Sequence, residues 1–380
     1  MPSFMKNLCQ RFLTFPLLIG CWAVNMLSAE SWTLIPAGAP FYTPDTGIGL
    51  GVYAIMCPGL VDVEESVLDR SEPGSPNQGT EPPGASKPRK QSEVVFFFSG
   101  TQNLQFSVGA QPEWYVNEDQ YRIGGYMELS HYPGEWWGLG SGSLKGNVET
   151  YEPSTLVWKG SIYRTFHSSL YVGPRFSFRY SEIEGGPLVT AMRGGAGGRA
   201  LGVGFGGVWD SRDSSFNPAK GVLADGFFEL YRTGWGSDWN YGVFQLDIRG
   251  YVSMGKTGVL ALQGKIQTAW GDVPFLSYPS LGGSVLMRGY PMGRFQDLTS
   301  LAVQGEYRFL LIGNVGGVVF LGAGDVAPSL PGYFSGSTPK IVGGFGIRFQ
   351  IDPQRRINAR LDVGFTAEGM GVYVLVKEAF

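Results

Sequence analysis

Apolar and polar residues alternate along the C-terminal half of the chain. In segment 244–252, FQLDIRGYV, the apolar residues fall on even positions, namely Phe244, Leu246, Ile248 and Val252. Polar residues lie between them, namely Gln245, Asp247 and Arg249. Segments 260–270, 301–309 and 357–365 repeat the pattern. Because successive side chains of a β-strand point to opposite faces, each segment predicts a strand with one apolar and one polar face.

The length of these runs distinguishes two kinds of β-protein. Strands of soluble β-sandwiches usually have about 5–6 residues, whereas a tilted strand needs about 9–11 to cross a bilayer. The alternating runs reach the longer value, and only 16% of the residues are charged against about 25% in ordinary soluble domains. Beyond residue 30 there is no apolar run of about 18 residues. The chain is therefore predicted to be all-β, a transmembrane antiparallel β-barrel.

Fifteen strands follow from the pattern. They are expected at 45–57, 92–100, 103–116, 120–132, 153–166, 168–182, 197–210, 221–233, 238–254, 257–271, 300–312, 316–324, 339–351, 356–366 and 369–380. Bacterial barrels have even strand numbers, so a sixteenth strand is expected at 135–147. The tight turns then lie in the periplasm, and the long connections at 58–91, 183–196, 272–299 and 326–338 lie outside the cell.

The first 29 residues are typical of a cleaved secretory signal peptide. Lys6 and Arg11 precede an apolar stretch that ends near the small residues Ser28 and Ala29. An alternative is a lipoprotein signal ending at Cys21. With cleavage at Ala29, Cys57 is the single cysteine of the barrel, so no internal disulfide is expected.

Segment 58–91 is rich in Pro, Gly, Ser and acidic residues and has few aromatic residues. Such a composition cannot bury enough apolar surface to offset the entropy lost on ordering. A mobile external loop is predicted, with an adhesive or antigenic loop as the alternative.

The motif MRGY, Met287 to Tyr290, lies in the connection at 272–299 between expected strands 11 and 12. Here the chain resembles the BamA/TamA outer-membrane insertase and translocase superfamily, also called the bacterial surface antigen family. The resemblance implies that this loop folds inside the barrel and docks Arg288 on an acidic strand residue. Glu306 is one of the polar residues of segment 301–309 that are expected to point into the barrel. It is the expected acceptor, because a guanidinium in a confined space needs a carboxylate partner.

One motif departs from the family pattern. The family carries F-x-D-x-G on the next strand, whereas this chain has Phe320, Gly322 and Gly324 with no carboxylate at the middle position. Asp325 is nearby but out of phase. The resemblance therefore implies that Arg288 is held from one side, by Glu306.

Two further segments carry the resemblance. The segment WDSRDSSFNPAKG is similar to a periplasmic strand turn of the family, with Asp210, Arg212, Asp213, Pro218 and Gly221 in structural roles. The chain ending resembles the family's final hairpin, whose lipid-facing residues serve as an assembly signal. In this chain these residues are Val372, Val374, Val376 and Phe380.

The resemblance implies an outer-membrane protein that assists insertion or translocation of protein or lipid. About fifteen residues lie between Ala29 and the first expected strand, so a short family member without periplasmic POTRA domains is expected. A weak seam between the first and last strands would open toward the bilayer, and Gly47, Gly49 and Gly51 would weaken its pairing. The alternative is a passive pore or a structural surface protein or antigen.

Other functional classes find little support in the sequence. A formal net charge of −3 without a basic patch disfavours nucleic acid as a partner. His131 and His167 are the two histidines, and the expected strand order puts both near the periplasmic rim, so no enzyme, metal or cofactor is predicted. The expected partners are outer-membrane lipid, the outer-membrane assembly machinery and polypeptide clients.

Overall fold

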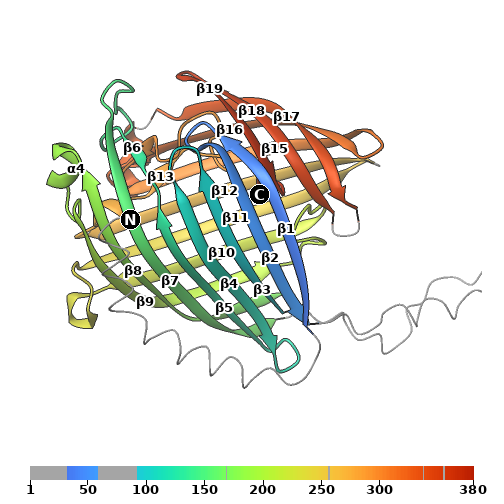
Figure 1. Ribbon diagram of the computed structural model, residues 1–380, viewed down its shortest axis with the longest axis horizontal. Coiled ribbons are helices and arrows are strands. Elements are labelled where there is room, and N and C mark those ends of the chain that lie inside the picture. The colour runs from blue at the N-terminus through green and yellow to red at the C-terminus, as the bar shows by residue number, and fades with distance from the viewer. Residues whose placement is uncertain (1–31, 59–91, 168, 256, 337, 354–355) are drawn as a thin grey trace, which may run out of the picture.

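The computed structural model describes residues 32–58, 92–167, 169–255, 257–336, 338–353 and 356–380. The predicted signal peptide, 1–29, and all of 59–91 lie outside these residues, so their expected roles stay predictions. Within the described part, sixteen long strands close into an antiparallel β-barrel, as predicted (Figure 1). They are β1 (Trp32–Thr43), β2 (Gly47–Pro58), β3 (Glu93–Thr101), β4 (Phe106–Val116), β5 (Tyr121–His131), β7 (Glu149–His167), β8 (Leu170–Gly185), β9 (Gly197–Asp210), β10 (Gly221–Tyr231), β11 (Tyr241–Met254), β12 (Gly258–Gly271), β15 (Thr299–Ile312), β16 (Val315–Ala327), β17 (Lys340–Asp352), β18 (Ile357–Thr366) and β19 (Gly369–Val376).

The remaining elements are short and lie in connections. β6 (Gly134–Trp136) pairs with β7 beyond the end of β5, and β13 (Ser280–Leu281) pairs with β14 (Phe295–Gln296). The helices are α4 (Pro187–Ala191), α5 (Leu330–Gly336) and the 3-10 turns η1 (Thr233–Trp235) and η2 (Phe275–Ser277). None of the described helices has the length and apolar character needed to span a membrane.

The predicted alternation is confirmed by burial. On β11, Ile248 and Val252 are exposed on the outer face, whereas Asp247 is buried inside. On β15, Val303 is exposed and Glu306 is buried. A shift of one residue would carry the charges into hydrocarbon, so the alternation fixes which face meets lipid.

The position of the sixteenth strand was predicted wrongly. It is β1, at Trp32–Thr43, and in segment 135–147 only Glu135 and Trp136 belong to a strand. Every strand before residue 135 therefore runs opposite to the predicted direction. Pro58 and Glu93, where β2 ends and β3 begins, lie at the other end of the barrel from the 272–298 connection, so the expectation that 58–91 opens on the same side was wrong.

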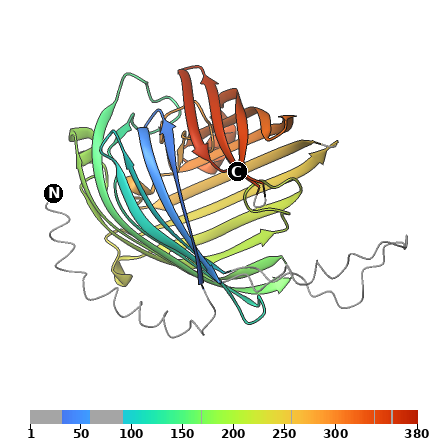
Figure 2. The same ribbon diagram turned by 45° about the vertical axis from the view of Figure 1, so that its right-hand side comes forward.

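The junction between the first and last strands is the weakest in the barrel. β1 is paired with β2 along its whole length, but it meets β19 at one pair, Tyr42 opposite Val374. Figure 2 shows the blue β1–β2 hairpin and the red β18–β19 hairpin running apart from this contact. We call this junction the seam.

Candidate functional site

The connection between β12 and β15, residues 272–298, folds into the barrel. Its residues Leu281, Met287, Tyr290 and Phe295 form a buried apolar cluster with the barrel wall. The wall residues in this cluster are Ala302 on β15, Val326 on β16 and Val342 on β17. Packing of this apolar surface holds the MRGY turn inside the barrel.

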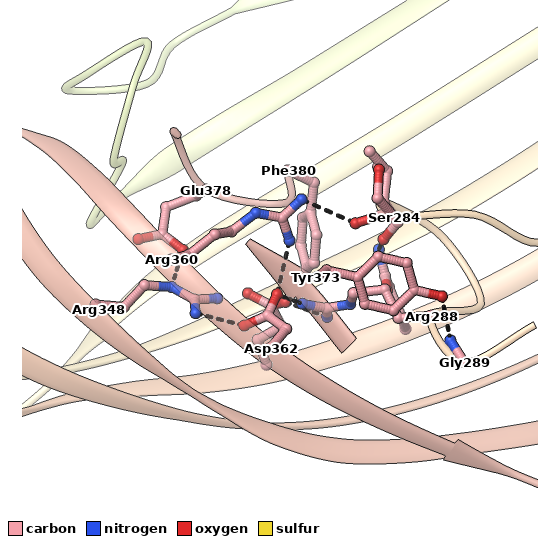
Figure 3. Close-up of polar contacts among 12 residues, drawn as sticks. Ser284, Arg288, Gly289, Arg348, Arg360, Asp362, Tyr373, Glu378 and Phe380 are labelled. Carbon is pink, nitrogen blue, oxygen red and sulfur yellow. Dashed lines mark hydrogen bonds and ion pairs between the residues drawn. The ribbon is translucent and has the colours of Figure 1, made fainter. Parts of the chain in front are cut away.

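The turn itself lies directly on β18. Gly289 has φ +114°, and a Cβ atom there would lie 2.6 Å from Thr366 Cγ2. On the strand below, a Cβ atom on Gly364 would lie 2.4 Å from the main-chain oxygen of Arg288. The Gly289 N–H donates to the Tyr373 hydroxyl at 2.8 Å (Figure 3). Gly289 and Gly364 therefore permit the close approach of the turn to β18, and the Tyr373 hydroxyl of β19 accepts the hydrogen bond from the Gly289 N–H.

Arg288 is fully buried between two carboxylates. It donates to Glu306 of β15 and, at 2.8 Å through Nη1, to Asp362 of β18. Its guanidinium lies 3.7 Å from the centre of the Phe320 ring. A buried guanidinium needs paired charge and hydrogen-bond acceptors, and this arrangement supplies both.

These groups belong to a larger network, which we call the arginine cluster. It consists of Arg288, Arg308, Arg348, Arg360, Glu306, Asp362 and Glu378. Asp362 also accepts from Arg348 Nη1 at 2.5 Å and from Arg360 Nη1 at 2.7 Å (Figure 3). Four guanidinium groups thus share three carboxylates.

The expectation that Arg288 is held from one side was wrong. Gly322 carries no acceptor, but Asp362 on another strand supplies the second carboxylate. Asp325 does not reach the turn, since it accepts from Ser141 Oγ at 2.9 Å and lies 3.8 Å from Lys340 Nζ. Phe320 contributes its ring to Arg288, whereas Gly324 packs against Ala302 of β15. Asp362 and Arg360 lie at polar positions of the alternating segment 357–365, but the sequence gave no means to see that the loop lies above them.

The last residues of the chain turn into the barrel. Lys377 has φ +73°, and Glu378 beyond it accepts from Arg348 Nε at 2.7 Å. Phe380 is buried, and its main-chain oxygen accepts from Arg308 Nη2 at 2.9 Å. Phe380 therefore does not share the lipid-facing phase of Val372, Val374 and Val376, and that part of the prediction was wrong.

Two further residues of the loop, Arg294 and Met292, contact opposite sides of the seam. Arg294 donates to both carboxylate oxygens of Glu368, at 2.7 and 2.6 Å, in the turn between β18 and β19. Two residues earlier, the Met292 N–H donates to Asp45 Oδ1 at 2.9 Å, in the turn between β1 and β2. Burial raises the pKa of the Asp45 carboxyl above its usual value, although the hydrogen bond from the Met292 N–H partly offsets this effect. We call these four residues, Asp45, Met292, Arg294 and Glu368, the seam bridge; no sequence motif pointed to them.

The turn motif at 210–221 holds two separate ion pairs. Asp210 accepts from Arg212 Nε at 2.9 Å and Nη2 at 2.8 Å. Asp213 does not join this pair but accepts from Arg356 Nη1 of the β17–β18 turn at 3.0 Å. After Pro218 the chain reaches Gly221, which has φ +106°, and a Cβ atom there would lie 2.3 Å from the Ser211 oxygen.

The histidines lie at opposite ends of the barrel. His131 ends β5 at the end that carries the 272–298 connection, and His167 ends β7 at the other, so placing both at one rim was wrong. His131 Nδ1 lies 3.0 Å from Ser154 Oγ, a neighbour that the sequence did not reveal. Glu152 Oε2 lies 4.0 Å from His131 Nε2, beyond hydrogen-bond reach, so no third group orients the ring. Among the described residues, no three His, Cys, Asp or Glu side chains are grouped to hold a metal ion.

A closed sixteen-stranded barrel with an arginine-bearing loop folded into its lumen defines a class of outer-membrane proteins. Residues 97–366 match the Omp85 superfamily domain, and the chain belongs to this superfamily, as its motifs predicted.

Solved structures share this fold. BamA from Haemophilus ducreyi lacking POTRA domains 1-3 matches with a TM-score of 0.60 and 13% identity, over 92% of this chain and 70% of that one. CdiB from Acinetobacter baumannii matches with a TM-score of 0.55 and 11% identity, over 92% of this chain and 60% of that one. CdiB from Escherichia coli matches with a TM-score of 0.57 and 9% identity, over 93% of this chain and 68% of that one. No curated protein sequence matches the chain.

Proposed function

We propose that this Omp85-type barrel assists the insertion or translocation of polypeptide or lipid by opening laterally at the seam. The observation that carries the proposal is the single Tyr42–Val374 pair between β1 and β19. Each strand pair in a barrel contributes main-chain hydrogen bonds, so the junction with one pair separates at the lowest cost.

Two prolines support a weak seam. Tyr42 is the β1 residue that faces β19, and Pro40 and Pro36 lie two and six positions before it, in the same phase. Because the direction of hydrogen bonding alternates along a strand, the nitrogens of both prolines face the seam. Proline has no N–H to donate, so β1 cannot pair with β19 at these positions through its own donors.

The seam bridge supplies the means of control. Asp45 and Glu368 lie in turns on opposite sides of the seam, and both are held by the same loop. The arginine cluster anchors that loop to β15 and β18. Release of the loop would free the turns on both sides together, so we propose that the loop keeps the seam shut until a client arrives.

A disulfide across the seam tests the proposal. Tyr42→Cys with Val374→Cys would join β1 to β19, and Phe228→Cys with Phe244→Cys, a directly opposed pair on β10 and β11, is the matched control. Both pairs would be made in a Cys57→Ser background and reconstituted into phospholipid vesicles. The readouts are transfer of a fluorescent lipid between leaflets and protease protection of an added unfolded β-barrel polypeptide.

The oxidised seam pair is expected to stop whichever activity the wild type shows, and reduction should restore it. The oxidised control pair should leave it unchanged. If the wild type is active and the oxidised seam pair is equally active, lateral opening is refuted.

A passive or structural role is the second candidate. The two prolines leave β1 short of N–H donors for an incoming strand, and this favours a barrel that keeps the fold without inserting clients. Planar-bilayer conductance of the wild type and of Arg288→Ala separates the candidates. Large steady channels in both proteins would support a pore, whereas small fluctuating currents that grow in the variant would support a loop that plugs the barrel.

A further inference from the structure

A cavity of about 140 Å³ lies inside the barrel, away from the arginine cluster. Its walls come from the six strands β7, β8, β9, β10, β11 and β12 and from the η2 turn of the inward connection. Three cationic side chains line it, Lys159, Arg175 and Arg179, together with one carboxylate, Glu229. None of these residues takes part in the contacts described above.

Strand register brings the three cations together. Lys159 on β7 is directly opposite Ser177 on β8. Arg175 and Arg179 lie two positions before and after Ser177, so their side chains share its face of the sheet. Diagonal neighbours of this kind are about 7–8 Å apart. Like charges at this separation repel each other, and an anion between them would offset the repulsion.

The protein itself supplies too little negative charge here. Glu229 accepts from Arg175 Nε at 2.6 Å, from Ser177 Oγ at 2.8 Å and from the Tyr231 hydroxyl at 2.8 Å, so both of its oxygens are engaged. Arg179 Nη1 donates to neutral groups, the Leu276 oxygen at 2.8 Å and Ser277 Oγ at 3.2 Å.

Of the three cations, Lys159 has the fewest contacts with polar or charged groups. Among the described residues, none forms a hydrogen bond or ion pair with its ammonium, and the nearest aromatic ring, Tyr126, is centred 5.9 Å away. Glu128 lies on the facing strand but outside the cavity lining, and it accepts from the Tyr126 hydroxyl at 2.7 Å. Among the side chains that line the cavity, three cations and one carboxylate thus leave an excess of two positive charges.

We propose that this cavity binds a phosphate group, either inorganic phosphate or a phosphate monoester. A phosphate monoester carries about −1.5 to −2 at pH 7, which matches the excess. Lys159 would act as a point charge, and Arg179 would present its planar N–H groups to two oxygens. The Ser277 and Tyr241 hydroxyls, 3.2 Å apart, add neutral polar groups to the lining. The volume exceeds the roughly 30 Å³ share of a water molecule several times, so a phosphate with bound water fits.

Binding to the purified full-length protein tests the proposal. In detergent and phosphate-free buffer, calorimetric titrations would compare inorganic phosphate, glycerol 3-phosphate and, at equal ionic strength, chloride. Lys159→Met keeps the length of the side chain and removes the charge. Lys265→Met is the matched control, because Lys265 is opposite Asp247 on the β11–β12 pair and does not line the cavity.

Wild type and Lys265→Met are expected to bind phosphate equally, and Lys159→Met is expected to bind about tenfold more weakly or worse, as for loss of one charge-assisted contact. Stronger binding of inorganic phosphate would assign the site to the free ion, and stronger binding of glycerol 3-phosphate to an ester; both support the proposal.

Thermal unfolding gives an independent readout. Without phosphate, Lys159→Met should melt above the wild type, because an unbalanced charge is removed. Phosphate should raise the transitions of the wild type and of Lys265→Met equally and that of Lys159→Met by less. The proposal is overturned if the wild type does not bind phosphate, if Lys159→Met binds as the wild type does, or if chloride reproduces the effect.

Discussion

We expect Asp362 to contribute more to the stability of the arginine cluster than any other of its residues. Asp362→Asn keeps the size of the side chain and removes its charge. Three guanidinium groups, those of Arg288, Arg348 and Arg360, donate to Asp362 at 2.8, 2.5 and 2.7 Å. An asparagine accepts through one oxygen only, so the substitution leaves the buried Arg360 without a carboxylate partner and takes one of two carboxylates from Arg288 and Arg348.

The magnitude follows from this count of partners. Leaving a buried charge uncompensated costs about 3–5 kcal/mol, and full burial of Arg288 and Asp362 means that solvent does not reduce the figure. Arg288→Met is different, because Glu306 keeps Arg308 at 3.0 Å and Asp362 keeps two arginines. Its cost should be near that of one charged hydrogen bond, about 1.5–3 kcal/mol.

Urea unfolding of the barrel in phospholipid bilayers, followed by tryptophan fluorescence, measures both costs. Asp362→Asn should lower the free energy of unfolding by about 3–5 kcal/mol and Arg288→Met by less. Heat-modified gel migration would confirm that both variants fold. If Arg288→Met costs as much as Asp362→Asn, or more, the partner counts do not govern the stability of the cluster.

Three further predictions concern the turns and the seam. Glu368→Gln removes the charge that Arg294 contacts, so protease should cleave the 272–298 connection faster, while Glu184→Gln, an exposed carboxylate at the end of β8, should have no effect. Pro40→Ala adds a main-chain N–H facing β19, where one hydrogen bond contributes about 0.5–1.5 kcal/mol. Amide hydrogen exchange of β19 should therefore slow. Unchanged exchange would contradict the conclusion that the nitrogen of residue 40 faces the seam. Burial raises the pKa of Asp213, but the hydrogen bonds from Arg356, Ala219 and Lys220 outweigh it and the net pKa is lowered. Its stabilising effect is therefore complete above the unfolded pKa of about 3.9 and is lost as pH falls through the lower folded value, so the difference in melting temperature between wild type and Asp213→Asn should shrink in acid. A difference that grows in acid would refute this sign.

Strand faces could be predicted from the sequence because alternation depends on local chemistry alone. The inward phase of Glu306 and Asp362 was visible in this way. β1 was missed because Pro36 and Pro40 interrupt its pattern, and prolines are tolerated there since the strand borders a poorly paired seam. The 135–147 segment was assigned a strand because an even strand number was required, but Trp136 packs against Ile183, Val189 and Phe275 in a cluster at the end of the barrel.

The contacts of the site could not all be predicted, because they join segments that are far apart in the sequence. Arg288 and Glu306 could be paired because the family motif joined them. The contribution of Asp362 follows from where the loop lies over the closed barrel, 74 residues away in sequence. The inward turn of Phe380 follows from the left-handed backbone at Lys377, a conformation that the sequence pattern did not signal.

The inward position of the last residues has a consequence for the order of assembly. Arg308 and Phe380 are 72 residues apart, and Glu378 contacts Arg348 and Asn358 on two different strands. Contacts this distant in sequence form only after the intervening chain has lost its freedom. We therefore expect residues 378–380 to settle after β15 to β18 have assembled, which makes the chain's final aromatic residue available to other proteins early in biogenesis and hidden from them once folding is finished.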